Sequence, residues 1–283
     1  MNLTTLARVV QTLSGKRMLF KTEFIQEAEL SIYMDRHFIE GATKHAIANA
    51  HEKDLEIQAK HGVKFLTYWF DEARSTAFCL VDAPNKDAVQ NVHNEAHGSV
   101  PHEILEVDPV IVEAFLGRVK DPTPVEMSGE VPIDSAFRAI MFTDLKDSTL
   151  LTTMLGDSKA LHLLHVHNAL TRNALRVFRG NEVKHTGDGI MASFVSGSDA
   201  VQCAMQIQKS LDAHNQSNPE ETLHLRIGLS AGEPIEEHGD FFGTAVQLAA
   251  RLCAQAEPSQ ILIAQEVHDE CKIDHCHFLT WAV

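Results

Sequence analysis

The sequence has no apolar run long enough to cross a membrane, and its first residues lack the hydrophobic stretch of a secretory signal. Basic residues are also scarce: 24 Lys and Arg stand against 39 Asp and Glu, which gives a formal net charge of −15. This balance argues against nucleic acid or an anionic membrane as a partner. We therefore expect a cytoplasmic protein.

Cysteine is sparse, and the five cysteines, at positions 79, 203, 253, 271 and 276, show no repeated pair spacing. Reduced thiols are therefore expected. Histidine is abundant by contrast, with 17 in the chain, which keeps metal binding in view. Near the C-terminus, Cys271, His275, Cys276 and His277 resemble a ligand cluster, although an irregular polar terminus is the favoured interpretation. The 283 residues, 44% of them hydrophobic, suit two domains of ordinary size.

The fold class expected is α+β, in two domains. Residues 1–30 carry a modest amphipathic pattern, which indicates a short helix or a lead-in. Residues 31–117 follow the order of a ferredoxin-like βαββαβ domain. Its expected segments are a strand at 31–38, a helix at 43–60, strands at 63–70 and 76–81, a helix at 85–97 and a strand at 103–112. Residues 118–135 are rich in proline and indicate a linker.

Polar residues on the apolar side of this first domain suggest a transition-metal site. His51 lies on the core face of the first helix, with Asp54 three residues on. On the second helix His93 and His97 are one turn apart, with Cβ atoms about 6 Å from each other, so one metal can reach both. His37 and Cys79 are positioned in the strands to complete the site. The alternatives are a hydrogen-bonded core histidine and a half-exposed polar flank.

The strings MDRHFIEG, HEKDLEIQAKHGV, YWFDE, FCLVDAP and HNEAHG resemble the DUF4242 family, which includes nickel-binding ferredoxin-like proteins. The resemblance covers most of residues 31–117. It implies a metal-sensing or metal-storing module, often dimeric, and imidazole ligands favour Ni²⁺, Cu²⁺ or Zn²⁺.

In the second half, two carboxylates stand at the ends of strands. The apolar run 139–144 ends in Asp144, and Asp188-Gly189 joins the two strands of a hairpin expected over 182–194. If strand and hairpin are neighbours in one sheet, the carboxylates converge. At about 5 Å and an effective dielectric of about 20 they repel by about 3 kcal/mol, unless a cation lies between them. Oxygen-only ligands favour Mg²⁺ or Mn²⁺. The alternative interpretation of each residue alone is that Asp188 is only a turn residue and that Asp144 only caps the following helix.

Residues 136–283 alternate strand and helix. Further helices are expected at 158–179, 198–214 and 243–256, and further strands at 223–231 and 260–264. Asp147, Ser148 and Thr149 can cap a helix whose free N–H groups receive a phosphate.

This half resembles a class III nucleotidyl cyclase catalytic domain. FTDLKDST, GNEVKHTGDG, LRIGLSAGEP and GDFFGTAVQLAARL carry the resemblance, in family order and spacing. It implies a mostly antiparallel central sheet and the conversion of ATP to cyclic AMP and pyrophosphate. The roles it implies are metal binding by Asp144 and Asp188, adenine reading by Lys184 and Asp240, transition-state stabilisation by Arg251, ribose orientation by Gln247, and substrate contacts by Leu145, Ser148 and Thr149.

In the family the metal residues come from one subunit and the base and arginine residues from the other. A single chain then holds half-sites, and a homodimer with twofold symmetry makes two equivalent sites. The exposed Phe241 and Phe242 suit a dimer arm. The expected partners are thus ATP and a second copy of the chain.

Three features depart from the family pattern. Gln247 stands where Asn is usual, and a displacement near 1 Å can slow catalysis about 10²-fold. Asp147 replaces a small residue near the phosphates. The sequence ends before the strands in which the family places a triphosphate-binding lysine. Two interpretations follow: an adenylate cyclase regulated by a transition metal in the first domain, or a weak or inactive cyclase-like protein that senses metal or nucleotide. A third interpretation is that the first domain serves only for dimerisation.

Overall fold

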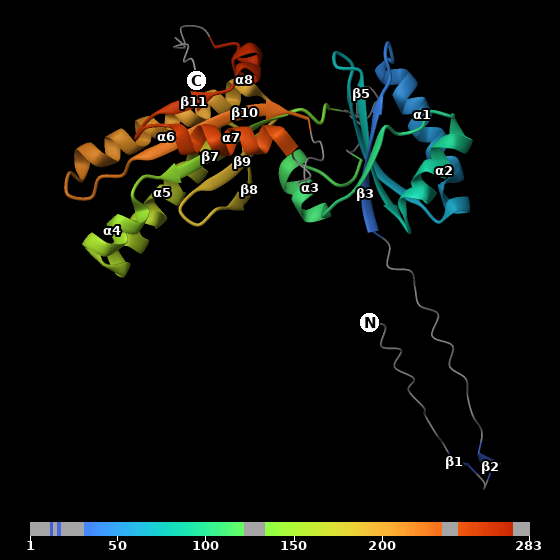
Figure 1. Ribbon diagram of the computed structural model, residues 1–283, viewed down its shortest axis with the longest axis horizontal. Coiled ribbons are helices and arrows are strands. Elements are labelled where there is room, and N and C mark those ends of the chain that lie inside the picture. Colours follow the sequence, from blue (N-terminus) through green and yellow to red (C-terminus); the bar gives the residue numbers. More distant parts are fainter. Residues whose placement is uncertain (1–11, 14–15, 18–30, 122–133, 234–242, 274–283) are drawn as a thin grey trace.

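The computed structural model describes residues 12–13, 16–17, 31–121, 134–233 and 243–273, which form two main domains (Figure 1). Within these ranges no helix combines the length and apolarity that a membrane span requires. Thr12–Leu13 (β1) pairs with Lys16–Arg17 (β2) as a small antiparallel ladder. A helix is therefore not formed at these four positions, and the rest of the lead-in lies outside the described residues.

The first domain has the expected βαββαβ order. Its elements are β3 (Ser31–Phe38), α1 (Lys44–Ile57), the short 3₁₀ helix η1 (Gln58–His61), β4 (Lys64–Asp71), β5 (Thr76–Ala83), α2 (Lys86–Ala96) and β6 (Glu103–Glu106). The strands form an antiparallel sheet in the order β4-β5-β3-β6. Thr43 and Asn85 cap the two helices, because each side-chain oxygen accepts a hydrogen bond from a backbone N–H three residues on.

The second domain is built around a five-stranded sheet. Its elements are β7 (Arg138–Leu145), α4 (Ser148–Leu155), α5 (Asp157–Val177), β8 (Asn181–His185), β9 (Ile190–Phe194), α6 (Gly197–Ser217), β10 (Leu225–Gly232), α7 (Gly243–Gln255), β11 (Ile261–Ile263) and α8 (Gln265–Glu270). The sheet order is β11-β10-β7-β9-β8, and β11 joins β10 in parallel while the other neighbours are antiparallel. The expected mostly antiparallel sheet is therefore confirmed.

Both domains repeat one connectivity. In each, the second and third strands form a hairpin, the first strand pairs with the third, and the fourth pairs with the first. Antiparallel neighbours joined in this way place two crossover helices on one face of the sheet. The other face of each sheet is then left to be covered by something else.

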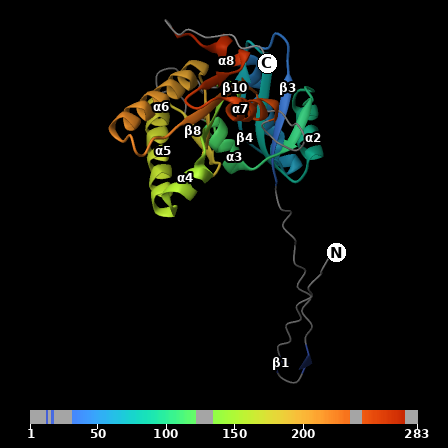
Figure 2. The same cartoon turned by 60° about the vertical axis from the view of Figure 1, so that its left-hand side comes forward.

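A helix between the domains supplies part of that cover. The expectation of a strand over 103–112 was wrong beyond residue 106, because α3 (Pro109–Leu116) begins there. Asp108 caps this helix by accepting a hydrogen bond from the Val110 N–H at 2.8 Å, and Pro109 fits the first helical turn. Figures 1 and 2 both show α3 between the two sheets.

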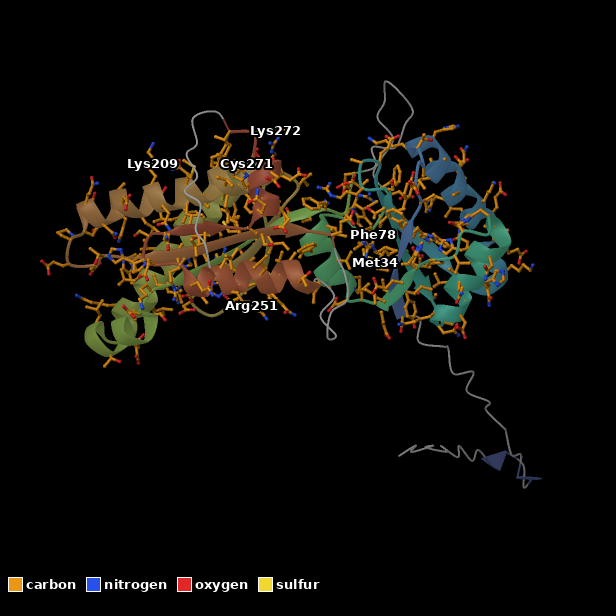
Figure 3. All side chains as sticks on the ribbon, turned by 45° about the horizontal axis from the view of Figure 1, so that its top comes forward. Met34, Phe78, Lys209, Arg251, Cys271 and Lys272 are labelled. Carbon is orange, nitrogen blue, oxygen red and sulfur yellow. The ribbon has the colours of Figure 1, made fainter. Side chains whose placement is uncertain are left out.

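The open faces of the two sheets share one hydrophobic core. Met34, Trp69, Phe78 and Leu80 of the first sheet cluster with Val112, Phe115 and Leu116 of α3 and with Ile140, Met191, Val246 and Ala249 of the second domain. Met34 and Phe78 are labelled in Figure 3. The opposite faces have cores of their own, under α1 and α2 in one domain and under α5 and α6 in the other.

Polar contacts also cross the junction. Arg118 donates to the Tyr68 carbonyl at 2.5 Å and packs its guanidinium over the Trp69 ring at 4.6 Å. Arg74 packs over the Phe137 ring at 3.7 Å. Arg36 on β3 lies 3.7 Å from Glu233, which follows β10. The junction therefore combines apolar burial with charged groups at its rim.

Candidate functional site

The end of β7 and the β8–β9 hairpin meet at one cleft. Asp144 and Asp188 both line it, in a volume of about 460 Å³, together with Leu145, Lys146, Asp147, Ser148, Thr153 and Arg226. The Leu145 N–H donates to the Asp188 carbonyl at 3.3 Å, so the two segments touch through their backbones. The structure thus brings together the two aspartates that the sequence assigned to a Mg²⁺ or Mn²⁺ site.

The hairpin turn differs in detail from the expected one. Its central residues are Gly187 and Asp188, because the Thr186 N–H donates to the Gly189 carbonyl at 2.9 Å. Gly187 has φ +92°, as in a turn with glycine at the first central position. Gly189 serves another purpose: a Cβ built there would lie 1.9 Å from the Thr143 carbonyl oxygen. Glycine therefore lets the hairpin pack directly on β7.

Each of the two carboxylates has a polar partner in the cleft. Arg226 on β10 stands opposite Asp144 in the strand register and donates to its Oδ2 from Nε at 2.9 Å. Ser148 Oγ donates to Asp188 Oδ2 at 2.5 Å. The donor set is oxygen only, balanced here by one guanidinium, which fits a hard divalent cation. Sequence reasoning missed Arg226, although it lies inside the motif LRIGLSAGEP.

The loop before α4 takes an unusual conformation. Asp147 occupies the cap position of α4 with φ +58°, and its side chain makes no capping hydrogen bond. Its carboxylate instead lies 3.2 Å from Lys146 Nζ. Leu145 lines the cleft although it is buried and belongs to the domain core. The side chain of Thr149 lies outside the described residues.

Lys184, Gln247 and Arg251, which the sequence also assigned to the reaction, do not line this cleft. Lys184 is exposed on β8, and Arg251 is exposed on α7, where Figure 3 labels it. Gln247 is half-buried one turn before Arg251 on the same helix. Asp240, Phe241 and Phe242 lie outside the described residues. One chain therefore places Asp144 and Asp188 in this cleft and Lys184 and Arg251 outside it.

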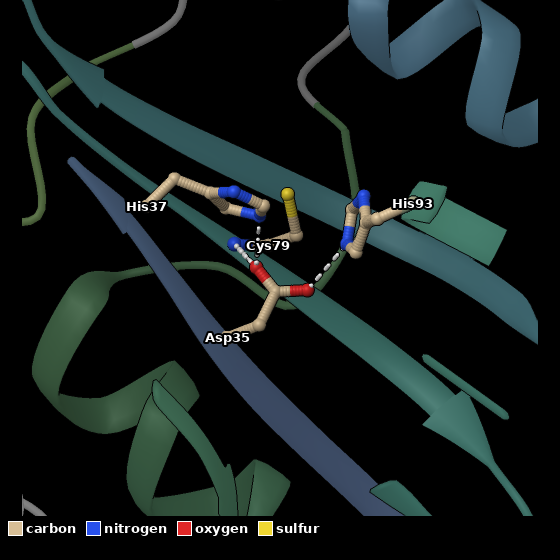
Figure 4. A group of neighbouring side chains, drawn as sticks. All are labelled: Asp35, His37, Cys79 and His93. Carbon is tan, nitrogen blue, oxygen red and sulfur yellow. Dashed lines mark hydrogen bonds and ion pairs between the residues drawn. The ribbon is translucent and has the colours of Figure 1, made fainter. Parts of the chain in front are cut away.

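A second cluster lies within the first domain, between its sheet and α2. Asp35, His37, Cys79 and His93 are all buried, and one ligand atom from each lies within 4.8 Å of the others (Figure 4). His93 Nε2 is 2.9 Å from Asp35 Oδ2, and His37 Nε2 is 3.2 Å from Asp35 Oδ1. Neither ring nitrogen of His37 makes a hydrogen bond of adequate geometry. Such unsatisfied buried donors and acceptors fit a bound cation.

A second group of ligands adjoins the first and shares His93. Asp54 on α1 lies 3.2 Å from His93 Nδ1 and 3.2 Å from His97 Nε2. Burial opposes charge at Asp35, but His93 and His37 hold the pKa of that carboxyl well below its usual range. Burial likewise opposes charge at His93, yet Asp35 and Asp54 raise its pKa to about 10. Burial and the two nearby carboxylates keep the pKa of Cys79 well above its usual value.

Five of the six side chains assigned to the transition-metal site are thus brought together, and His51 is not. The His51 ring packs on Tyr68 at 4.5 Å, and its Nε2 lies 3.6 Å from Asp121. Asp35 was missed, although strand alternation places it on the same face as His37. That period-two signal was available in the sequence.

The comparisons agree with both halves of this description. The family model "Adenylate and Guanylate cyclase catalytic domain" matches residues 135–280, more than half of the chain, which therefore belongs to that family. A second family model, "Nickel responsive protein SCO4226-like", matches residues 33–107. The two matches follow one another in the order that the sequence predicted.

Among curated relatives, an adenylate cyclase of Mycosarcoma maydis is 33% identical over 177 residues, which are 53% of this chain and 7% of that protein. One from Podospora anserina is 29% identical over 170 residues, or 52% of this chain and 8% of that protein. The chain thus spans less than a tenth of the length of either. An adenylate/guanylate cyclase/hydrolase structure from Silicibacter pomeroyi is 33% identical, with a TM-score of 0.39 over 47% of this chain and 78% of that one.

Proposed function

We propose that this chain is an adenylate cyclase that converts ATP to 3′,5′-cyclic AMP and pyrophosphate as a homodimer with Mg²⁺ or Mn²⁺. The observation that carries the proposal is the cleft where Asp144 and Asp188 meet, beside Arg226 and Ser148. Membership of the cyclase family supports cyclase activity, and the residues at the base-reading positions support ATP as the substrate.

The reaction is attack of the ribose 3′-hydroxyl on the α-phosphorus with loss of pyrophosphate. The divalent ions held by Asp144 and Asp188 would acidify the hydroxyl and neutralise the leaving group. Arg251 would donate to the α-phosphoryl oxygens as negative charge builds on them. Arg226, already in the cleft, is placed to neutralise phosphate charge when an ion takes its position at Asp144.

Base choice would follow from hydrogen-bonding character. Adenine presents an acceptor at N1 and a donor at its amino group, so a lysine and an aspartate match it. Guanine presents the opposite pair on this edge and would leave both side chains unpaired. Lys184 is exposed on β8 and does not line the cleft. Such a position suits a side chain that contacts the base of a nucleotide bound to the neighbouring subunit.

The direct test is turnover of ATP and of GTP by purified protein with Mn²⁺, beside Asp144→Asn. We expect cyclic AMP from ATP, little product from GTP, and loss of at least about 10²-fold in the variant, because a metal ligand is removed. Asp212→Asn, on the exposed side of α6, is the matched control and should keep wild-type rates. Equal amounts of cyclic AMP from wild type and Asp144→Asn would refute the proposed adenylate cyclase activity.

A second function has one observation in its favour. Gln247 is half-buried on α7, so its longer side chain has limited room to adjust. A chain that binds nucleotide but does not turn it over would be a nucleotide sensor. Binding of ATP by calorimetry without cyclic AMP production, restored to turnover by Gln247→Asn, would establish that alternative.

We also propose that a transition metal in the first domain regulates the cyclase. Strand β3 would connect the metal site to the cyclase domain. Asp35 and His37 face the ligand cluster, while Met34 and Arg36 face the second domain. A shift of β3 on metal binding would therefore move groups on its other face. Cyclic AMP production with and without Ni²⁺ tests this, and Arg36→Gln should reduce the response without changing Ni²⁺ affinity. Equal rates in both conditions would refute regulation.

A further inference from the structure

The imidazole of His93 is held between two carboxylates. Its Nε2 lies 2.9 Å from Asp35 on β3, and its Nδ1 lies 3.2 Å from Asp54 on α1. Nδ1 is also 3.3 Å from His97 Nε2. The side chain of His93 is 1% exposed, so both nitrogens face protein groups and neither faces solvent. One ring is therefore shared by two sets of metal-ligating atoms.

Each set is complete enough to hold its own ion. The first contains Asp35, His37, Cys79 and His93, which gives four donors of the types that Zn²⁺, Co²⁺ and Ni²⁺ accept. The second contains Asp54, His93 and His97, which gives three donors. Asp54 Oδ1 and both nitrogens of His37 lack a hydrogen bond of adequate geometry although they are buried. Unsatisfied atoms therefore occur on both sides of His93.

Charge also favours a pair of ions over a single one. Asp35, Asp54, a Cys79 thiolate and a doubly deprotonated His93 would each supply one negative charge. Two divalent ions would balance these four charges. With a single ion His93 keeps a proton on its other nitrogen, and the three remaining negative charges exceed the charge of the ion in a buried site.

We propose that the first domain holds a pair of divalent transition-metal ions bridged by the imidazolate of His93. This rests on the transition-metal binding proposed above. One ion bonds to Asp35, His37, Cys79 and His93 Nε2, and the other to Asp54, His97 and His93 Nδ1. On binding, the protons of the His93 ring nitrogens and of the Cys79 thiol go to solvent, and no electron is transferred.

The experiment loads the full chain with Co²⁺, dialyses it and measures metal content, the near-ultraviolet thiolate-to-cobalt band and the cobalt EPR signal. We expect about two ions per chain and an EPR signal far weaker than the cobalt content, because the bridge couples the two spins. His97→Gln should remove one ion, keep the thiolate band and restore a full EPR signal from the remaining ion. Cys79→Ser should lose the band.

His45→Gln, an exposed histidine on α1, is the matched control and should behave as wild type. One ion per chain in the wild type would overturn the bridge and leave transition-metal binding intact. Two ions with uncoupled EPR signals would overturn the bridge as well. No bound cobalt would overturn the metal-binding proposal itself. None of these measurements depends on ATP turnover. Failure of the metal-bridge proposal can therefore be distinguished from failure of the proposed cyclase activity.

Discussion

At the scale of single residues, the charge on His93 makes the metal-free protein sensitive to pH. The folded pKa of His93 is raised to about 10, above the ordinary value of 6.5. Its proton therefore contributes stability that is fully present below about pH 6.5 and is lost as the pH rises toward 10. The lowered pKa of Asp35 acts in the opposite direction, and its contribution is lost only in acid.

We therefore expect the free energy of unfolding to fall between pH 6.5 and 9.5 in the presence of a chelator. Urea unfolding of the full chain at several pH values measures this. His93→Gln removes the titrating group and should flatten the decline, whereas His45→Gln should not. A decline of equal slope in His93→Gln would show that other groups cause it.

Two glycines of the hairpin should respond differently to alanine. At Gly189 a Cβ would lie 1.9 Å from the Thr143 backbone, which cannot move aside without disturbing β7. At Gly187 a Cβ meets nothing within 4 Å, and the cost is that of φ +92° alone. We expect Gly187→Ala to cost about 1–2 kcal/mol and Gly189→Ala more. Thermal unfolding measures both, and equal losses would contradict the close packing described for Gly189.

Several site residues could be predicted from the sequence because local pattern marks them. Asp144 ends an apolar run and Asp188 lies in a glycine-flanked turn, so the sequence predicted that the two converge, and both line the cleft. Arg226 could not be placed opposite Asp144, because the pairing of residues 82 positions apart is set by tertiary packing rather than by local sequence. Strand alternation could have placed Asp35 on the same face as His37. Its role as a ligand is indicated only by its contact with His93, which the sequence does not show.

At the scale of elements, α3 contacts both domains and holds them together. Its last carbonyls are held by the second domain: Arg138 donates to Leu116 O at 2.9 Å, and Ser193 donates to Phe115 O at 2.8 Å. Its apolar face packs against the first sheet. The sequence signal Asp108-Pro109 for a helix start was present, but the apolar run that follows it reads equally well as a strand.

Truncation of α3 should therefore uncouple the domains. Phe115 is 1% exposed in the shared core, so Phe115→Ala should cost about 3–5 kcal/mol. We expect calorimetry to change from one transition to two, because the junction is weakened more than either domain. Val110→Ala on the same helix is the control, since Val110 is 72% exposed and should have little effect. A single transition at a lower temperature in Phe115→Ala would argue against two separable units.

At the scale of the whole molecule, the two domains have the same connectivity and pack together through a shared core, besides the separate core of each domain. Each fold could be predicted by itself from its order of strands and helices. Their packing could not, because Met34, Phe78, Ile140 and Val246 come together only in three dimensions and carry no periodic signal of their partners. The fold does predict that the helix-free face of the first sheet must pack against another part of the protein. A ferredoxin-like sheet has helices on one side only.

The separation of site residues within one chain leads to the last prediction. Asp144 and Asp188 line one cleft, whereas Lys184 and Arg251 lie elsewhere. If sites form between subunits, Asp144→Asn and Arg251→Ala remove different halves of each site. An equal mixture of the two variants, unfolded and refolded together, should recover about a quarter of wild-type turnover, since half of the dimers are mixed and each carries one intact site.

The control is a mixture of Asp144→Asn with Asp188→Asn, which damages the same half of the site in both chains. No mixed dimer then contains an intact site, so no activity should return. Recovery in both mixtures would point to exchange artefacts, and recovery in neither would mean that a single chain assembles its whole site. Only recovery confined to the first mixture fits a dimer in which each cleft is completed by the partner's α7 and β8, because only that pairing reunites two undamaged halves.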